Sequence, residues 1–373
     1  MSFSHFTTRA VLLLFPLFCA KPFLAQEKPP HACFEQPNGA KEAIRRLPEG
    51  ARYWLAEDAI YIITPEERCA FLHLENDPER EQFIEQFWCR RSVDPISLDY
   101  DFKTEHYRRI VFANEKYGDQ LAGWKTDRGR IYVLFGPPDS VDSVADQRAA
   151  RAAPNQDSST YLHPAEKWRY HYVKGIGENV EFQFEFVARY ADYALAAPDQ
   201  NLLEQRADLN PDRLPRTPEN IQLYVVAERP PKIRFKDLEA LVGSRVVRDQ
   251  VKFSYRVEFA AATHATTLAR IHIQIPCEAC THDGQVVPSL AYPLFIRVSK
   301  PSGWVVDTSE LTADMATHDT SNSAHILSAH LDVPLAPGTY QLAIAVKNAT
   351  TGDAGTVRTQ LEVPTFELLG TKN

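Results

Sequence analysis

The chain has 373 residues, of which 44% are hydrophobic and 11% aromatic, so it is long enough for about two domains and is not disordered throughout. Its formal net charge of -8 is opposite in sign to that of a non-specific nucleic-acid-binding protein. We therefore expect a folded protein with no nucleic-acid partner.

The first 25 residues are typical of an export signal. Arg9 precedes an apolar segment, residues 10–18, that is too short to span a membrane. We expect cleavage after Ala25, with a position nearer Ala20 as the alternative. No later segment approaches the roughly 18 apolar residues of a membrane span, so none is expected after cleavage. We expect the mature protein to be periplasmic, associated with the outer envelope or secreted.

Three helices are predicted after a disordered tail over residues 26–46. The first begins at Thr64, which forms a capping box with Glu67 and precedes a proline at the first helical position. The second begins near Asn76, where Asn76 and Asp77 can cap the helix and Pro78 follows. The apolar residues of this helix recur at helical spacing. The third runs from about residue 99 to 117.

Residues 123–130 hold the densest cluster of special residues in the chain. We interpret them as a polar loop that leads into a strand over 131–135 and then into a Gly-Pro-Pro turn. In this interpretation the tryptophan is a buried anchor, the glycines set the turn, and the threonine or aspartate accepts backbone N–H bonds. The structural motif so defined comprises Gly123, Trp124, Thr126, Asp127, Gly129, Gly136, Pro137 and Pro138.

The remaining sequence favours strands. Residues 141–164 lack a sustained period and are expected to be a mobile insertion. A β-hairpin is predicted from alternation over 168–173 and 180–186, with its apolar side covering the helices. Beyond a proline-rich stretch, strands are predicted at 223–227, 251–259, 268–275, 294–298, 325–333, 340–346 and 356–363.

These elements predict an α+β fold in which N-terminal helices pack on a small antiparallel sheet, followed by an all-β immunoglobulin-like sandwich. The expected divisions are a signal peptide (1–25), a tail (26–46), an α+β domain (47–195), a linker (196–220), a β-sandwich domain (221–366) and a tail (367–373).

The chain resembles the bacterial GWxTD domain family, whose name gives the motif present here as residues 123–127. Further similar segments are 61–68, 83–88 with Arg90 and Arg91, 106–109, 128–130, 136–139 and 168–170. The family domain would cover roughly residues 50 to 190. The resemblance implies an exported bacterial protein, and it implies no activity, substrate or catalytic residue.

Three side chains are candidates for catalysis. Asp127 could act as a base or ligand beside Thr126 or Arg128, but no partner lies at a diagnostic spacing. Glu105 and His106 could belong to a helix-borne metal cluster, although the two-histidine spacing of zinc helices is missing. The structural alternative pairs Glu105 with nearby arginines and places His106 on the packed helix face.

Five cysteines follow the leader, and an odd number cannot all pair within one chain. Cys277 and Cys280 are candidates for a disulfide; with His282 they could instead supply most of a zinc site. Cys69 and Cys89 lie among apolar helical residues and are interpreted as small hydrophobic side chains.

The sequence thus favours an exported cell-envelope protein that is a non-enzymatic interaction or structural module, with another envelope protein as partner and no cofactor. The alternative is an envelope hydrolase whose site lies near residues 123–130 at the domain interface. The hydrolase would be favoured if at least three of five side chains met in an open cleft. These five are Glu105, His106, Asp127, Arg128 and Asp139.

Overall fold

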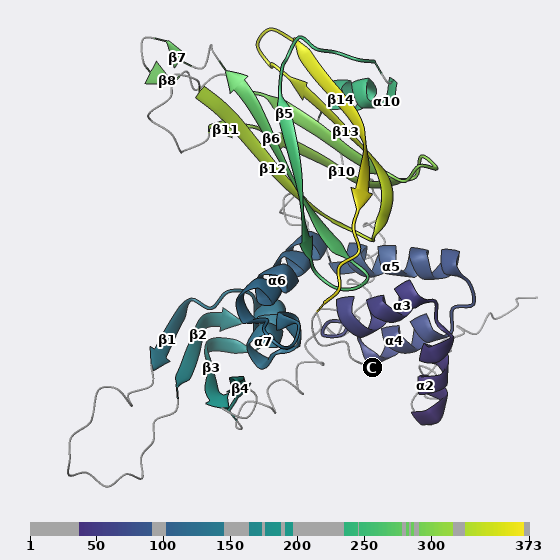
Figure 1. The fold of residues 1–373 in the computed structure, drawn as a ribbon, viewed down its shortest axis with the longest axis vertical. Coiled ribbons are helices and arrows are strands. Elements are labelled where there is room, and N and C mark those ends of the chain that lie inside the picture. Colours follow the sequence, from purple (N-terminus) through teal and green to yellow (C-terminus); the bar gives the residue numbers. More distant parts are fainter. Residues whose placement is uncertain are drawn as a thin grey trace, which may run out of the picture.

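The computed structural model describes residues 37–91, 102–144, 164–173, 176–187, 191–196, 235–244, 246–277, 281–282, 285–286, 291–315 and 325–368. Helices come first and several antiparallel sheets follow, so the fold is mixed α+β (Figure 1). We call the described residues up to 196 the N-terminal part and those from 235 the C-terminal part. The predicted export signal, the strand at 223–227 and nearly all of the predicted linker lie outside the described residues.

The N-terminal part is mainly helical. Its helices are α2 (Pro37–Arg46), α3 (Glu49–Tyr53), the π-helix η1 (Trp54–Asp58), α4 (Pro65–Leu72), α5 (Asp77–Arg91), α6 (Phe102–Tyr117), the 3-10 helix η2 (Gly123–Lys125) and α7 (Asp127–Phe135). The predicted tail over 26–46 is therefore wrong for its last ten residues, which form α2. Ile44 of α2 packs against the helical core.

The predicted helix starts are present. At α4, the Thr64 hydroxyl accepts the Glu67 N–H at 3.0 Å and the Glu67 carboxylate accepts the Thr64 N–H at 3.1 Å, which confirms the capping box. The second helix is confirmed as α5. The third is confirmed as α6 over its described residues, and it ends at Tyr117 as predicted.

The predicted strand over 131–135 is wrong, because these residues belong to helix α7. Thr126 caps this helix, since its hydroxyl accepts the Gly129 N–H at 3.0 Å. Gly136 ends the helix with a φ of +79°, a conformation that favours glycine. The β-branched and aromatic residues of the segment suit a strand locally, and the caps at both ends outweigh that preference.

A small antiparallel sheet packs against α7. Its strands lie in the order β1 (Ser140–Val144), β2 (Ala165–Val173), β3 (Gly177–Val187) and β4 (Asp192–Leu195). Strands β2 and β3 confirm the predicted hairpin. Strand β1 shows that the expected mobile insertion begins as a paired strand. The apolar face of the sheet meets Ile131 and Phe135 of α7, whereas α2 to α6, with η1, contribute to a separate core.

The C-terminal part consists of two facing four-stranded sheets. One has the order β10 (Val305–Thr312), β9 (Pro293–Ser299), β13 (Gly338–Lys347), β14 (Ala354–Val363); the other has β11 (Asp314–Met315), β12 (His325–Leu335), β6 (Thr267–Cys277), β5 (Ser254–Ala261). A two-residue pair, β7 (Thr281–His282) and β8 (Gln285–Val286), lies apart.

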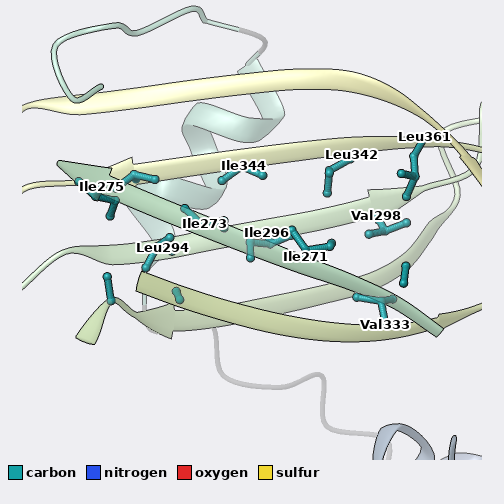
Figure 2. Close-up of a cluster of buried hydrophobic side chains, with 14 of the residues drawn as sticks. Ile271, Ile273, Ile275, Leu294, Ile296, Val298, Val333, Leu342, Ile344 and Leu361 are labelled. Carbon is teal, nitrogen blue, oxygen red and sulfur yellow. The ribbon is translucent and has the colours of Figure 1, made fainter. Parts of the chain in front are cut away.

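Both sheets contribute to one hydrophobic core (Figure 2). Ile271 and Ile273 of β6 and Ile296 and Ile344 of β9 and β13 are all 1% exposed or less. Six of the seven predicted strands correspond to β5, β6, β9, β12, β13 and β14, while β10 and helix α10 (Lys236–Ser244) were not predicted. Helix α10 covers the outer face of β9 and β13 through an apolar cluster that includes Leu238.

Candidate functional site

The tryptophan of the motif is a buried anchor, as predicted. Trp124 is 3% exposed and belongs to the helical core. Its ring lies edge-on to that of Tyr61, with centroids 5.9 Å apart, and the Tyr61 hydroxyl donates to the Trp124 carbonyl at 3.0 Å. Burial raises the pKa of Tyr61 to about 12, so this phenol remains a donor at neutral pH.

Gly123 and Gly129 serve close packing, which differs from the turn role we predicted for them. Neither has a positive φ. A Cβ atom on Gly123 would overlap the backbone carbonyl of Ala113 in α6, and one on Gly129 would overlap the carbonyl of Gly123 itself. Helix α6, η2 and the first turn of α7 therefore meet backbone to backbone, which only glycine permits.

The polar motif residues bond to backbone. Thr126 caps α7 and also donates its hydroxyl proton to the Gly123 carbonyl at 2.8 Å. Asp127 Oδ2 accepts the N–H of Leu195 in β4 at 2.9 Å. The carboxylate thus joins the start of α7 to the last strand of the small sheet, in agreement with the structural interpretation of Asp127.

Arg128 occupies a site built from two carboxylates and two rings. Its guanidinium donates to Glu166 at 3.2 Å and to Asp192 at 3.0 Å. It also lies over the rings of Tyr117 and Tyr193, 5.1 Å and 4.2 Å from their centroids. These contacts hold α7, α6, β2 and β4 together.

The other candidate residues lie in separate networks. Glu105 pairs with Arg109 at 2.8 Å, one turn along α6. His106 is 4% exposed and donates from Nε2 to the carbonyl of Asp58 at 2.8 Å. Asp139 accepts the His171 N–H at 2.6 Å. With Asp127 and Arg128 bonded as above, the five residues do not converge in the described structure.

A buried polar cluster joins the two parts of the chain, and no residue pattern had indicated it. Asp58 of η1 is 1% exposed. Its carboxylate accepts the hydroxyls of Tyr107 at 2.6 Å and Thr266 at 2.7 Å, and also that of Thr263. Tyr107 belongs to α6, whereas both threonines belong to the turn between β5 and β6.

A second polar contact between the two parts lies beside this cluster. The carboxylate of Glu57 accepts the backbone N–H of His264 at 2.9 Å and lies 2.8 Å from its Nδ1. The His264 ring stacks on Tyr53 with centroids 4.8 Å apart. Lys125 of the motif lies 3.7 Å from Glu57, so the motif reaches the edge of the same interface.

Asn114 of α6 connects the motif to the interface directly. Its side-chain oxygen accepts the Trp124 N–H at 3.3 Å. Its side-chain nitrogen donates to the carbonyls of Ala261 and Ala262, at 3.0 Å and 2.9 Å. One amide therefore bonds to both parts of the chain.

Two hydrogen-bonded neighbours, Asp58 at the interface and His106 behind it, are buried groups with opposite pKa shifts. Burial raises the pKa of Asp58 from 3.8 to about 6, against the three hydroxyl donors, which lower it. Burial lowers the pKa of His106 from 6.5 to about 4, and Arg109 and Arg91 lower it further. Both groups are therefore most stable in their neutral forms.

The two shifts act on stability in opposite directions. The raised pKa of Asp58 adds to the free energy of unfolding. This addition is complete below pH 3.8 and is lost as the pH rises through about 6. The His106 contribution is full above pH 6.5 and is lost as the pH falls toward about 4. Between these limits the two contributions offset each other.

We predict that Asp58→Asn uncovers the histidine contribution. Relative to its own value at pH 8, the free energy of unfolding of the variant should fall by about 2 kcal/mol at pH 5, because only the His106 contribution then changes. In the wild type, the stability gained at Asp58 as the pH falls should offset much of this loss. Denaturant titrations at both pH values measure the difference, and identical pH profiles would contradict the assignment.

The cysteines differ in part from expectation. Cys69 is disulfide-bonded and Cys89 is exposed, so the interpretation of both as small hydrophobic side chains is wrong. The disulfide and zinc hypotheses for Cys277, Cys280 and His282 stay predictions, because these side chains lie outside the described structure. Among the described residues, no group of three or more His, Cys, Asp or Glu could hold a metal ion. No helix there is long and apolar enough to cross a membrane.

Comparison with known proteins identifies one family. Residues 46–162 match the GWxTD domain, which confirms the resemblance seen in the motif. No curated protein matches the chain. Among solved structures, the crystal structure of the MHC-like protein MILL2 is similar over 55% of this chain and 68% of its own, at 11% identity and a TM-score of 0.18. That score is too low to support any conclusion about the fold.

Proposed function

We propose, on the premise that residues 46–162 of this chain form a GWxTD domain, that the protein is an exported component of the bacterial cell envelope. In this proposal it acts as a non-enzymatic interaction or structural module. The alternative is an envelope hydrolase with a site near residues 123–130.

The observation that carries the proposal is the use of the motif's own side chains. Thr126 bonds to the backbone of its own turn, at Gly123. Asp127 and Arg128 bond to residues of β4. A general base or nucleophile needs a partner aimed at a substrate, whereas these groups are aimed at the protein. The motif therefore fits a role in holding a scaffold together.

We further propose that the C-terminal part is an immunoglobulin-like domain that contacts the partner or acts as a spacer. Its strands lie in the orders β5-β6-β12-β11 and β14-β13-β9-β10, which correspond to the A-B-E-D and G-F-C-C′ sheets of such domains. The Tyr340 hydroxyl at the start of β13 donates to the Ala336 carbonyl at 3.0 Å, which resembles the tyrosine corner of this fold.

Two observations support export. The first 25 residues have the composition of a signal peptide. Cys69 is disulfide-bonded, and protein disulfides form and persist mainly in oxidising compartments.

Cell fractionation tests the location. We expect the tagged chain in the envelope or periplasmic fraction, or in the medium, in a form shortened by its leader. A matched variant with Leu12→Arg and Leu13→Arg, which breaks the apolar core of the leader, should stay in the cytoplasm at full length. Recovery of both chains in the cytoplasm would contradict export.

Crosslinking in intact cells separates the scaffold from the hydrolase. A photo-crosslinking residue at Trp304, which is 63% exposed, should capture a protein partner. Asp127→Asn keeps an oxygen that can accept the Leu195 N–H, so the variant should capture the same partner and leave cell-envelope integrity unchanged. A folded Asp127→Asn protein that fails to sustain the envelope would favour the hydrolase.

A further inference from the structure

The turn between β5 and β6 enters the N-terminal part as a preformed unit. The N–H of Thr266 donates to the Thr263 hydroxyl oxygen at 3.1 Å, and the N–H of Thr263 donates to the Thr266 carbonyl at 3.0 Å. The Thr263 hydroxyl oxygen thus accepts a bond inside the turn, while its proton goes to Asp58. The shape of the turn and its attachment to η1 depend on the same hydroxyl.

Apolar contacts seat the turn in the helical core. Ala262 and Leu268, which flank the turn, are both 0% exposed and belong to the core formed mainly by η1, α4, α5 and α6. Asn114 holds the carbonyls on the β5 side of the turn. The helical core therefore holds this turn both by hydrogen bonds and by buried apolar contacts.

The ion pairs between the two parts that lie farther from the turn are more exposed. Arg108 pairs with Asp332 at 2.6 Å, Arg270 with Glu115 at 3.5 Å and Lys300 with Glu81 at 3.5 Å. Their side chains are 21% to 71% exposed, and exposed ion pairs contribute little to association. The buried hydrogen bonds between the two parts thus lie at Asp58 and the turn that it bonds, while Leu368 and Ala260 add apolar packing against the helical core.

We propose that Asp58, Thr263 and Thr266 form a latch that holds the C-terminal part docked on the GWxTD domain, and that release of this latch frees the C-terminal part while both parts stay folded. The inference does not depend on the location or the partner proposed above. It predicts local opening at the interface below the free energy of global unfolding. The two-part arrangement is then a conformational equilibrium that one carboxylate and two hydroxyls help to set.

Hydrogen exchange of the full chain, followed by mass spectrometry, tests the latch. In a double variant, Thr263→Val with Thr266→Val, we expect exchange over residues 54–58 and 262–268 to rise about tenfold or more, because both donors from the turn are lost. Exchange in α7 and β13 should change less than about twofold.

A matched control uses a threonine that donates to a carboxylate within one part. Thr339 of β13 donates to Glu362 of β14 at 2.9 Å, so Thr339→Val should leave exchange at the interface unchanged. Unchanged interface exchange in the double variant would overturn the latch. An equal rise throughout the chain would also overturn it, since the turn would then be part of a single cooperative core.

The wild-type protein provides a second measurement that does not depend on a variant folding. In increasing sub-denaturing urea, residues 54–58 and 262–268 should exchange together in a step that precedes exchange of α7 and β13. Simultaneous exposure of all four segments would contradict separate release. Failure of the double variant to fold would do the same, because the contact would then be required for folding itself.

Discussion

Trp124→Ala is expected to lower the free energy of unfolding by about 3 to 5 kcal/mol, the usual range for a large aromatic side chain in a core. The indole is 3% exposed, and it contacts Tyr61 and the ammonium group of Lys125, which lies 4.9 Å from the ring centroid. The backbone bonds of residue 124 to Tyr61 and Asn114 remain possible in the variant. The loss is therefore one of packing.

Urea titration followed by near-ultraviolet circular dichroism measures this loss. Trp124→Phe is the control, because the indole N–H has no hydrogen-bond partner among the described residues and only part of the apolar area is removed. We expect the phenylalanine variant to lose less than half as much stability as the alanine variant. An unchanged midpoint in Trp124→Ala would refute the role of the ring as an anchor.

Gly129→Ala is expected to cost about 3 kcal/mol or more, even though alanine favours helices. The new methyl group would overlap the Gly123 carbonyl and crowd the Trp124 Cα, and neither backbone atom can move as a side-chain end can. Relief of the overlap requires η2 and α7 to separate, which would also disturb the Thr126 cap. We expect the loss to appear as a lower midpoint of thermal and urea unfolding.

Gly50→Ala is the matched control for helix propensity. Gly50 lies in α3, has ordinary helical backbone and has no atom within 4 Å of an added Cβ. This change should be neutral or stabilise the protein by up to about 1 kcal/mol. If Gly129→Ala behaved like Gly50→Ala, the backbone contact between η2 and α7 would not exist in solution.

Features that depend on neighbours in sequence were predictable. The capping box at Thr64 and Glu67 involves residues three apart, so its signal is complete within one short segment. The β2–β3 hairpin is likewise visible as two alternating segments around one turn. Elements of this kind can be recognised from one short segment of sequence without knowledge of distant contacts.

The segment after the motif was misassigned because two local signals conflict there. Ile131 to Phe135 has the composition of a strand, yet Thr126 supplies a helix cap and Gly136 a helix stop. The glycine at position 129, inside the helix, further weakened the helical signal. Its presence is explained only by contact with the Gly123 carbonyl, which becomes visible in three dimensions.

Asp58 could not have been identified from the sequence. Its hydroxyl partners lie 49, 205 and 208 residues away in the chain, and isolated threonines in a turn carry no specific signal. Glu105 and His106 are adjacent in sequence and Asp127 belongs to the motif, but in the structure each bonds to a different group. The buried acid that does join the parts stands in a segment without a recognised pattern.

The side chain of Asn114 restricts which substitutions the chain can accept at that position. Aspartate would offer no donor to the carbonyls of Ala261 and Ala262, and serine would be too short to serve both sides at once. Glutamine would displace the amide by one methylene. The asparagine at position 114 therefore serves the contact between the GWxTD domain and the β-rich part that follows it. Among related sequences, we expect asparagine at this position where such a β-rich part is present and other residues where it is absent.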